Sequence, residues 1–157
     1  MKQLIFVFLI LLVLAGCDDS RVYEVNNEFD DKYWLADSTQ TFNFAITDSA
    51  SAYNIYYNLR NSVSYPFRNI YVRYQLRDSS GNILQTDLVN GDLFESKTGK
   101  PLGDGLGDVF DHRFIILNDY TFPASGTYEV DLSQYMRRDT LPEILAVGIR
   151  IEKSMNE

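Results

Sequence analysis

Hydrophobic and polar residues alternate with a period of two along much of the chain after Gln40. Alternation of this kind places one face of a β-strand on a core and the other in water. The runs are rich in β-branched and aromatic residues, which strands favour. Their apolar members are Phe42, Phe44 and Ile46; Tyr53, Ile55, Tyr57 and Leu59; Ile70, Val72, Tyr74 and Leu76; Tyr128, Val130 and Leu132; and Leu145, Val147, Ile149 and Ile151.

Turn signals separate these runs, and no segment keeps a helical period of 3.6 residues. We expect turns at 78–82, 90–91 and 122–126, and a helical turn at 133–138. Residues 26–38 read as a polar loop with embedded aromatics that dock on the domain. The glycine-rich stretch 91–111 reads as a long irregular loop, with regular structure returning at Arg113. The pattern predicts an all-β fold, an antiparallel β-sandwich of about eight or nine strands.

The N-terminus has a different pattern, because Leu4 to Leu14 is an unbroken apolar run after a positively charged start. Eleven residues are too few for a membrane-spanning helix, which needs about 20, but they suit a secretory signal. The following Leu14-Ala15-Gly16-Cys17 resembles the bacterial lipoprotein box, which implies cleavage before Cys17 and lipidation of its thiol. We therefore predict a lipoprotein signal peptide at 1–16, a lipid-anchored tether at 17–21 and a single domain at 22–157.

Composition narrows the choice of partners for the mature chain. Cleavage before Cys17 would leave 141 of the 157 residues and remove Lys2, which changes the formal charge from −8 to −9. An acidic surface argues against binding to nucleic acid or to anionic lipid headgroups. Membrane attachment would then depend on the acyl chains, of which two or more give stable anchoring. Since Cys17 is the only cysteine, the chain has no internal disulfide.

Several short motifs distributed over the chain together resemble the gliding-motility lipoprotein H family of Bacteroidota. They are the lipobox cysteine Cys17, the segment 66–71 (PFRNIY), the loop 98–108 (TGKPLGDGLGD), and the stretches 126–128 (GTY), 134–137 (QYMR), 141–142 (LP) and 147–150 (VGIR). The resemblance implies a cell-envelope lipoprotein needed for gliding and linked to the type 9 secretion and motility apparatus. It implies no catalytic residues and no cofactor, and its expected partners are the membrane and other envelope proteins of that apparatus.

The position of the lipoprotein in the envelope stays partly open. We expect the outer membrane, but the acidic residues Asp18 and Asp19 after the cysteine have conflicting precedents. In enterobacteria, Asp at this place resembles an inner-membrane retention signal. In gliding bacteria, early acidic residues resemble a signal for export to the surface, so the periplasmic and surface faces both remain possible.

Three aspartates in the glycine-rich stretch, Asp104, Asp108 and Asp111, could hold a cation such as Ca²⁺ or contact a partner protein. Their spacing does not match an EF-hand, and a solvated loop with local capping is the favoured interpretation over a metal site. A partner-binding role is the better functional hypothesis, because the loop is long. The sole histidine, His112, follows Asp111 directly, and neighbours on a strand point to opposite faces, which makes a catalytic pair unfavourable.

Aromatic residues raise a second hypothesis, that of a surface glycan-binding lipoprotein. Trp34, Tyr56 and Tyr71, with Arg73, are the candidates for an exposed aromatic patch that could stack on sugars or contact a protein. The alternative is that most aromatic rings belong to the core and its edges.

Two weaker motifs complete the candidates. The segment 91–98 (GDLFESKT) is a near match to a phosphate-binding loop, but it has Ser96 at the second glycine position and lacks the strand-then-helix context. Ser38, Ser49 and Thr140 each follow an aspartate, a pattern that resembles the O-glycosylation acceptor of this bacterial lineage.

Overall fold

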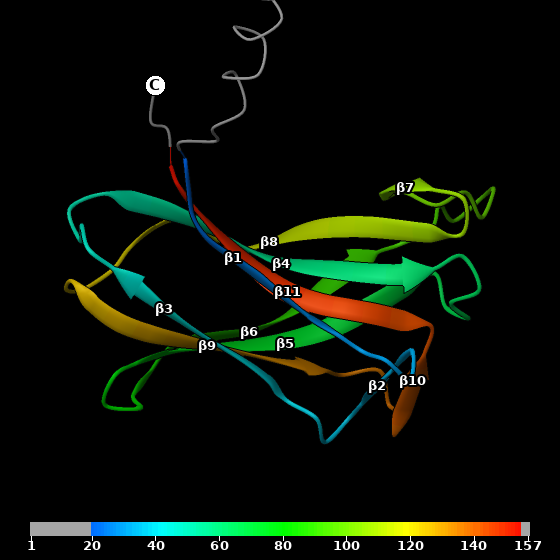
Figure 1. Ribbon diagram of the computed structural model, residues 1–157, viewed down its shortest axis with the longest axis horizontal. Helices are drawn as coiled ribbons and strands as arrows, with labels where there is room; N and C mark the ends of the chain where they lie inside the picture. The colour runs from blue at the N-terminus through cyan, green and yellow to red at the C-terminus, as the bar shows by residue number, and fades with distance from the viewer. Residues whose placement is uncertain (1–19, 155–157) are drawn as a thin grey trace, which may run out of the picture.

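Two antiparallel sheets pack face to face, and a two-stranded ribbon closes one end of the sandwich (Figure 1). The computed structural model describes residues 20–154. The five-stranded sheet has the order β1 (Arg21–Glu28), β11 (Ile144–Lys153), β4 (Ala52–Ser62), β8 (Val109–Thr121) and β7 (Asp104–Leu106). The four-stranded sheet has the order β3 (Gln40–Ile46), β9 (Gly126–Gln134), β5 (Asn69–Asp78) and β6 (Ile83–Asp92). The ribbon pairs β10 (Thr140–Pro142) with β2 (Tyr33–Leu35).

The period-two runs form strands with the expected faces inward. Along β4 every second residue from Tyr53 to Asn61 is buried, and β5 alternates in the same way from Ile70 to Leu76. β11 is the exception, because seven of its ten residues are buried on both faces of a central strand. The two inner faces interdigitate into one core whose largest fully buried side chains include Trp34, Phe42, Tyr53, Tyr57 and Phe122.

The predicted all-β sandwich is confirmed, with eight strands of seven residues or more and three strands of three residues. Four local predictions were wrong. The expected turn at 90–91 lies inside β6. The expected loop at 26–38 contains the end of β1 and all of β2, and β7 and the start of β8 lie inside the expected loop at 91–111. The expected helical turn at 133–138 is the end of β9 followed by bends. No helix in residues 20–154 is long and apolar enough to cross a bilayer.

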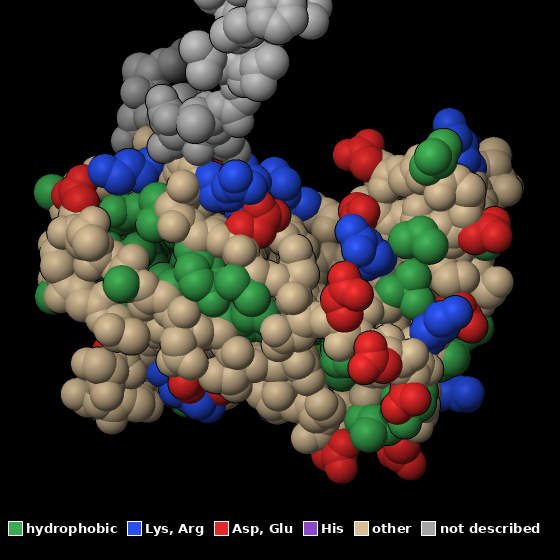
Figure 2. All heavy atoms as spheres, in the orientation of Figure 1, with side chains coloured by type: hydrophobic (Ala, Val, Ile, Leu, Met, Phe, Trp, Pro, Cys, Tyr) green, Lys and Arg blue, Asp and Glu red, His purple; other side chains and the backbone are tan. Residues whose placement is uncertain are grey.

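Both ends of the described chain lie at the same end of the sandwich. The Lys153 amide donates to the Ser20 carbonyl at 2.8 Å, and Arg21 pairs with Glu152. Figure 1 shows the start of β1 beside the end of β11, with β2 and β10 at the opposite end. In Figure 2, acidic side chains gather over that opposite end, and basic side chains lie along the edge where β1 begins. The predicted signal peptide and Cys17 lie outside the described residues.

Candidate functional site

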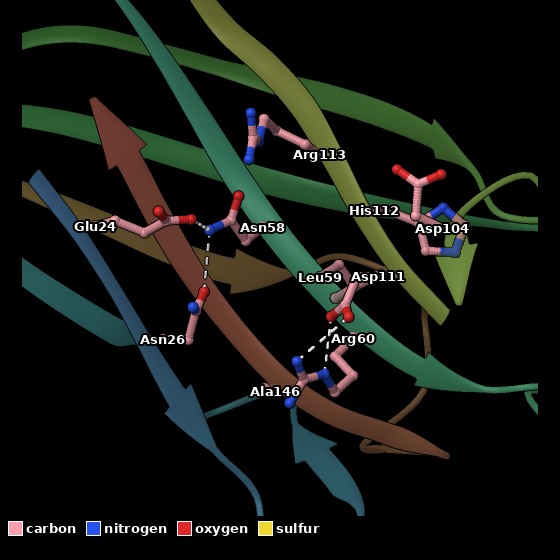
Figure 3. A pocket seen from close by; sticks show the side chains of 10 residues that line it. All are labelled: Glu24, Asn26, Asn58, Leu59, Arg60, Asp104, Asp111, His112, Arg113 and Ala146. Atoms are coloured by element: carbon pink, nitrogen blue, oxygen red, sulfur yellow. Dashed lines mark hydrogen bonds and ion pairs between the residues drawn. The ribbon is translucent and has the colours of Figure 1, made fainter. Parts of the chain in front are cut away.

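A polar hollow of about 420 Å³ crosses the outer face of the five-stranded sheet (Figure 3). Its walls come from β1, β4, β8 and β7, and its floor from β11. Charged and amide side chains dominate it, because this face of the sheet is turned to solvent. The lining residues are Glu24, Asn26, Asn58, Leu59, Arg60, Asp104, Asp111, His112, Arg113 and Ala146.

The hollow exists because β11 carries small residues between strands with longer side chains. Ala146 lines the floor, and the next outward position is Gly148. A Cβ on Gly148 would lie 2.0 Å from Asn26 Oδ1 and 2.3 Å from the Val25 carbonyl oxygen. With no side chain there, Asn58 Nδ2 reaches over β11 and donates to Asn26 Oδ1 at 3.1 Å. This amide bridge joins β1 to β4 across the strand between them.

Glu24 is the centre of the hydrogen-bond network at one end of the hollow. It accepts from Asn58 Nδ2 at 3.0 Å, from Arg150 Nη1 at 2.8 Å and from Arg21 Nη1 at 3.1 Å. Burial would raise the pKa of Glu24, but the bonds from Arg21, Arg150 and Asn58 outweigh it and hold that pKa below its usual value. Glu24 is therefore a fixed, charged acceptor and not a proton donor near neutral pH.

Arg60 organises the other end of the hollow. Its Nε lies 2.8 Å from Asp111 Oδ1 and its Nη2 lies 3.3 Å from Asp111 Oδ2, a bidentate pair, while Nη1 lies 3.6 Å from Glu28 Oε1. The hydrogen bond to Asp111 raises the pKa of Arg60 above its usual value. Asp104 faces Asp111 across the β7–β8 hairpin, where the two residues are paired. Several of the charges in the hollow are thus paired with one another.

The three aspartates considered for a cation do not converge. Asp111 is engaged by Arg60, Asp104 lies opposite it on β7, and Asp108 occupies the turn, where its carbonyl accepts from the Val63 amide at 2.8 Å. Residues 20–154 contain no group of three or more His, Cys, Asp or Glu side chains placed to hold a metal ion. A solvated loop with local capping stays the favoured interpretation over a Ca²⁺ site, and Asp104 and Asp111 line the hollow.

His112 and Asp111 point to opposite faces of β8, as expected. His112 is buried and stacks on Phe114 with ring centroids 5.8 Å apart, while Asp111 binds Arg60 outside. Burial lowers the pKa of His112, although the charges of Asp111 and Asp104 oppose the shift. Its Nε2 has no hydrogen-bond partner among the described residues. The imidazole is a neutral part of the core wall in this arrangement.

The predicted aromatic patch does not form. Trp34 is completely buried, stacks on Phe29 and donates from Nε1 to the Ser38 carbonyl at 2.7 Å. Tyr56 is half-buried on the outer face of β4, with Arg113 over its ring at 5.8 Å. Tyr71 is 40% exposed on β5, in the other sheet. The three rings therefore share no surface, and Trp34 cannot stack on a sugar.

The near match to a phosphate-binding loop has a structural explanation. Gly91 lies inside β6, where a Cβ would meet the Tyr57 hydroxyl at 2.5 Å and the Phe114 ring at 2.8 Å. The glycine allows the two sheets to approach closely. It does not form a phosphate cradle at the start of a helix.

The three predicted glycosylation positions differ in their surroundings. Thr140 is exposed on β10, while Ser38 and Ser49 are half-buried. Ser38 Oγ also accepts from Gln40 Nε2 at 2.9 Å. Modification of these residues stays a prediction.

Sequence reasoning missed most of the hollow, namely Glu24, Asn26, Asn58 and Arg60. One signal was available, because Gly107-Asp108 is a two-residue turn sequence between the paired residues Leu106 and Val109. Gly107 has a φ of 71°, as hairpin turns with glycine at the first central position require. Reading that turn as a hairpin would have brought Asp104 beside Asp111 on the sheet.

Comparison with known proteins identifies the family. A sequence model described as GldH lipoprotein matches residues 21–151, which is nearly the whole described domain. The chain belongs to the GldH lipoprotein family. The resemblance drawn from the residues is thereby confirmed.

Two curated relatives agree with GldH membership. The gliding motility lipoprotein GldH homolog of Christiangramia forsetii is 30% identical, over 97% of this chain and 96% of the relative. The gliding motility lipoprotein GldH of Flavobacterium johnsoniae is 29% identical, over 90% of this chain and 91% of its own length.

Among solved structures, the VP2 subviral particle of infectious bursal disease virus aligns with this GldH chain at a TM-score of 0.44 and 18% identity. The alignment covers 88% of this chain and 33% of the viral chain.

Proposed function

We propose that this GldH protein is a lipid-anchored component of the cell envelope that is required for gliding motility. It works without catalysis, by protein–protein contacts with the gliding and type 9 secretion apparatus. Lipidation of Cys17, with palmitate among the acyl chains, attaches it to the outer membrane. The whole-domain match to the family and the names of its two relatives support the cellular role.

The observation that carries the contact mechanism is the polar hollow. Its side chains are held by hydrogen bonds and ion pairs across β1, β11, β4 and β8, so that their positions are set before a partner arrives. Pre-organised polar groups lower the entropy cost of binding and favour specificity. The β7–β8 hairpin forms one wall and offers Asp104, an exposed carboxylate, as a charge that a partner can contact.

Two experiments test the role and the surface separately. For the role, we expect deletion of the gene, or Cys17→Ala, to abolish cell spreading, and we expect radiolabelled palmitate to enter the wild-type protein only. Normal gliding in both strains would contradict the proposal.

For the surface, we expect the charge reversal Asp104→Lys to reduce gliding while the protein stays folded and abundant. The matched control is Asp87→Lys on β6, an exposed aspartate of the other sheet. Equal gliding in the two variants would show that the hollow is not the contact surface.

A further inference from the structure

A second hollow, of about 450 Å³, lies where β5 and β9 meet the bent segment 135–139. We call it the arginine hollow after Arg73, Arg137 and Arg138, which line it together with Tyr135. Asp139 is the only acidic residue among its lining residues. The charged residues that line this hollow are thus three arginines and one aspartate, on a chain with a formal charge of −8.

These three arginines differ from the other arginines in residues 20–154 in having no carboxylate partner. The other six each have a carboxylate oxygen within 4.0 Å, and they are Arg21, Arg60, Arg68, Arg77, Arg113 and Arg150. No ion pair within the described part of the chain involves Arg73, Arg137 or Arg138. Because Asp and Glu outnumber Lys and Arg by 22 to 14, the arginines left unpaired are expected to be few, and here all three line one hollow.

Two of the guanidinium groups lie over aromatic rings. The Arg73 guanidinium lies 5.7 Å from the centre of the Tyr135 ring, and that of Arg138 lies 5.8 Å from the centre of the Phe67 ring. Stacking on a ring uses the face of the guanidinium and leaves its N–H edges free. Those edges form the fork that matches a carboxylate in bidentate geometry. Tyr135 itself is 55% exposed and adds an aromatic surface to the hollow.

The buried side chain of Gln134 hydrogen-bonds to the backbone of the segment 135–139, which carries Arg137 and Arg138. Gln134 Nε2 donates to the Arg138 carbonyl at 2.7 Å, and Gln134 Oε1 accepts from the Met136 amide at 2.9 Å. The Tyr135 amide donates to the Tyr71 carbonyl at 2.8 Å. Arg137 has a φ of 54°, in the left-handed region that residues with a Cβ seldom adopt. The segment is therefore a constrained platform for its arginines.

The location of the arginine hollow argues against a lipid headgroup as its ligand. It lies where β9 ends, near the β2–β10 ribbon, whereas Ser20 lies at the opposite end of the sandwich (Figure 1). Three extended residues reach about 10 Å, so a lipidated Cys17 keeps the bilayer near Ser20. The eight residues of β1 alone span about 25 Å between the two ends. The hollow thus lies at the end of the domain opposite the one that the predicted lipid anchor precedes.

We propose that the arginine hollow binds an acidic segment of a partner protein, through bidentate contacts of its carboxylates with Arg73 and Arg138. Charge complementarity between these guanidinium groups, which have no carboxylate partner, and the carboxylates of such a segment favours binding at this hollow. The inference goes beyond the proposed function, because it assigns a second surface and the chemistry of its ligand.

The test measures binding of a fluorescent oligoglutamate peptide to the full-length protein purified in detergent. The test variant is Arg73→Gln/Arg138→Gln. The matched control is Lys97→Gln/Lys100→Gln, which removes the same charge from exposed lysines outside the hollow. We expect the arginine variant to bind about tenfold more weakly or worse, as loss of charge-assisted bonds predicts. The lysine variant should bind within about twofold of the wild type, as removal of distant surface charge predicts.

An oligoglutamine peptide of the same length should not bind, and added salt should weaken the oligoglutamate complex. If the double variant melts early, the single variants Arg73→Gln and Arg138→Gln make the same comparison. No binding of oligoglutamate, or equal loss in the arginine and lysine variants, would overturn the proposal. Arginine-dependent binding that favours a sulfated polysaccharide, or arginine-dependent self-association, would replace it with an anionic glycan or a second copy. The measurement is made in solution, so its outcome is independent of the gliding role.

Discussion

Asn58 and Asn26 hydrogen-bond to each other over the backbone of Gly148, with 3.1 Å between Asn58 Nδ2 and Asn26 Oδ1. This contact connects the two strands on either side of β11 on the outer face of the sheet. It leaves no room for a side chain at position 148 of β11.

Gly148→Ala should therefore destabilise the fold. The new Cβ would lie 2.3 Å from the Val25 carbonyl oxygen, so that the backbone of β1 must shift, and we expect a loss of about 1–3 kcal/mol in the free energy of unfolding. Urea denaturation of the wild type and the variant measures it. The double variant Asn26→Ala/Gly148→Ala removes the clash with the Asn26 side chain. Its loss in the free energy of unfolding should be smaller than the sum of the losses in the two single variants. Strict additivity would contradict the close contact.

Arg77→Met should be costly because it leaves Asp131 buried without its cation. Arg77 Nη1 lies 2.6 Å from Asp131 Oδ2, and Asp131 Oδ1 accepts from Thr41 Oγ1 at 2.6 Å. Removing one partner of a largely buried pair costs about 2–4 kcal/mol. Arg68→Met breaks the exposed pair with Asp92 and should cost less than about 1 kcal/mol. Similar unfolding midpoints for the two variants would refute the distinction.

Stability should fall as the pH drops below about 6.5, the usual pKa of histidine, and His112 should cause part of the fall. Burial lowers the pKa of His112 in the folded protein, so in this range the unfolded chain binds a proton more readily. The contribution is fully present above the unfolded pKa and is lost as the pH falls toward the folded pKa. Urea denaturation at pH 7.5 and at pH 5.5 would show a smaller difference for His112→Gln than for the wild type. An identical difference would exclude His112 as the source.

Trp34→Ala should act on stability and not on ligand binding. The ring is fully buried, so its removal should cost about 3–5 kcal/mol in unfolding free energy. Trp34→Phe keeps the stacking on Phe29 but leaves the Ser38 carbonyl without its donor, which should cost about 1–3 kcal/mol. Thermal or urea unfolding ranks the three proteins. A Trp34→Ala protein as stable as the wild type would mean that this ring lies outside the core.

The long strands could be predicted because their period-two runs face a core on one side only, as in β4 and β5. β8 begins at Val109, earlier than expected. Its buried residue next to Asp111 is His112, and because histidine is not counted as apolar, the period-two pattern could not be recognised there. β2 has only three residues, which is too short for an alternating pattern to be recognised. Trp34 was therefore assigned to a loop. Short strands of this kind are set by tertiary packing.

The candidate sites were harder to predict than the strands. The polar hollow and the arginine hollow each combine residues from several strands whose order in the sheet the sequence does not state. Asn26 and Asn58 are 32 positions apart, and Arg73 and Arg138 are 65 apart. Single alternating runs indicate which residues point outward, but not which outward residues become neighbours.

The placement of both described chain ends at one end of the sandwich has a mechanical consequence. A pull transmitted from Ser20 and resisted at the far end of the domain runs along β1, which is paired with β11 from Arg21 to Glu28. That geometry loads the bonds of the β1–β11 ladder together in shear, so they share the tension and are not unzipped one after another. A domain that bears tension through its N-terminus resists it best when its first strand enters the sheet in this direction.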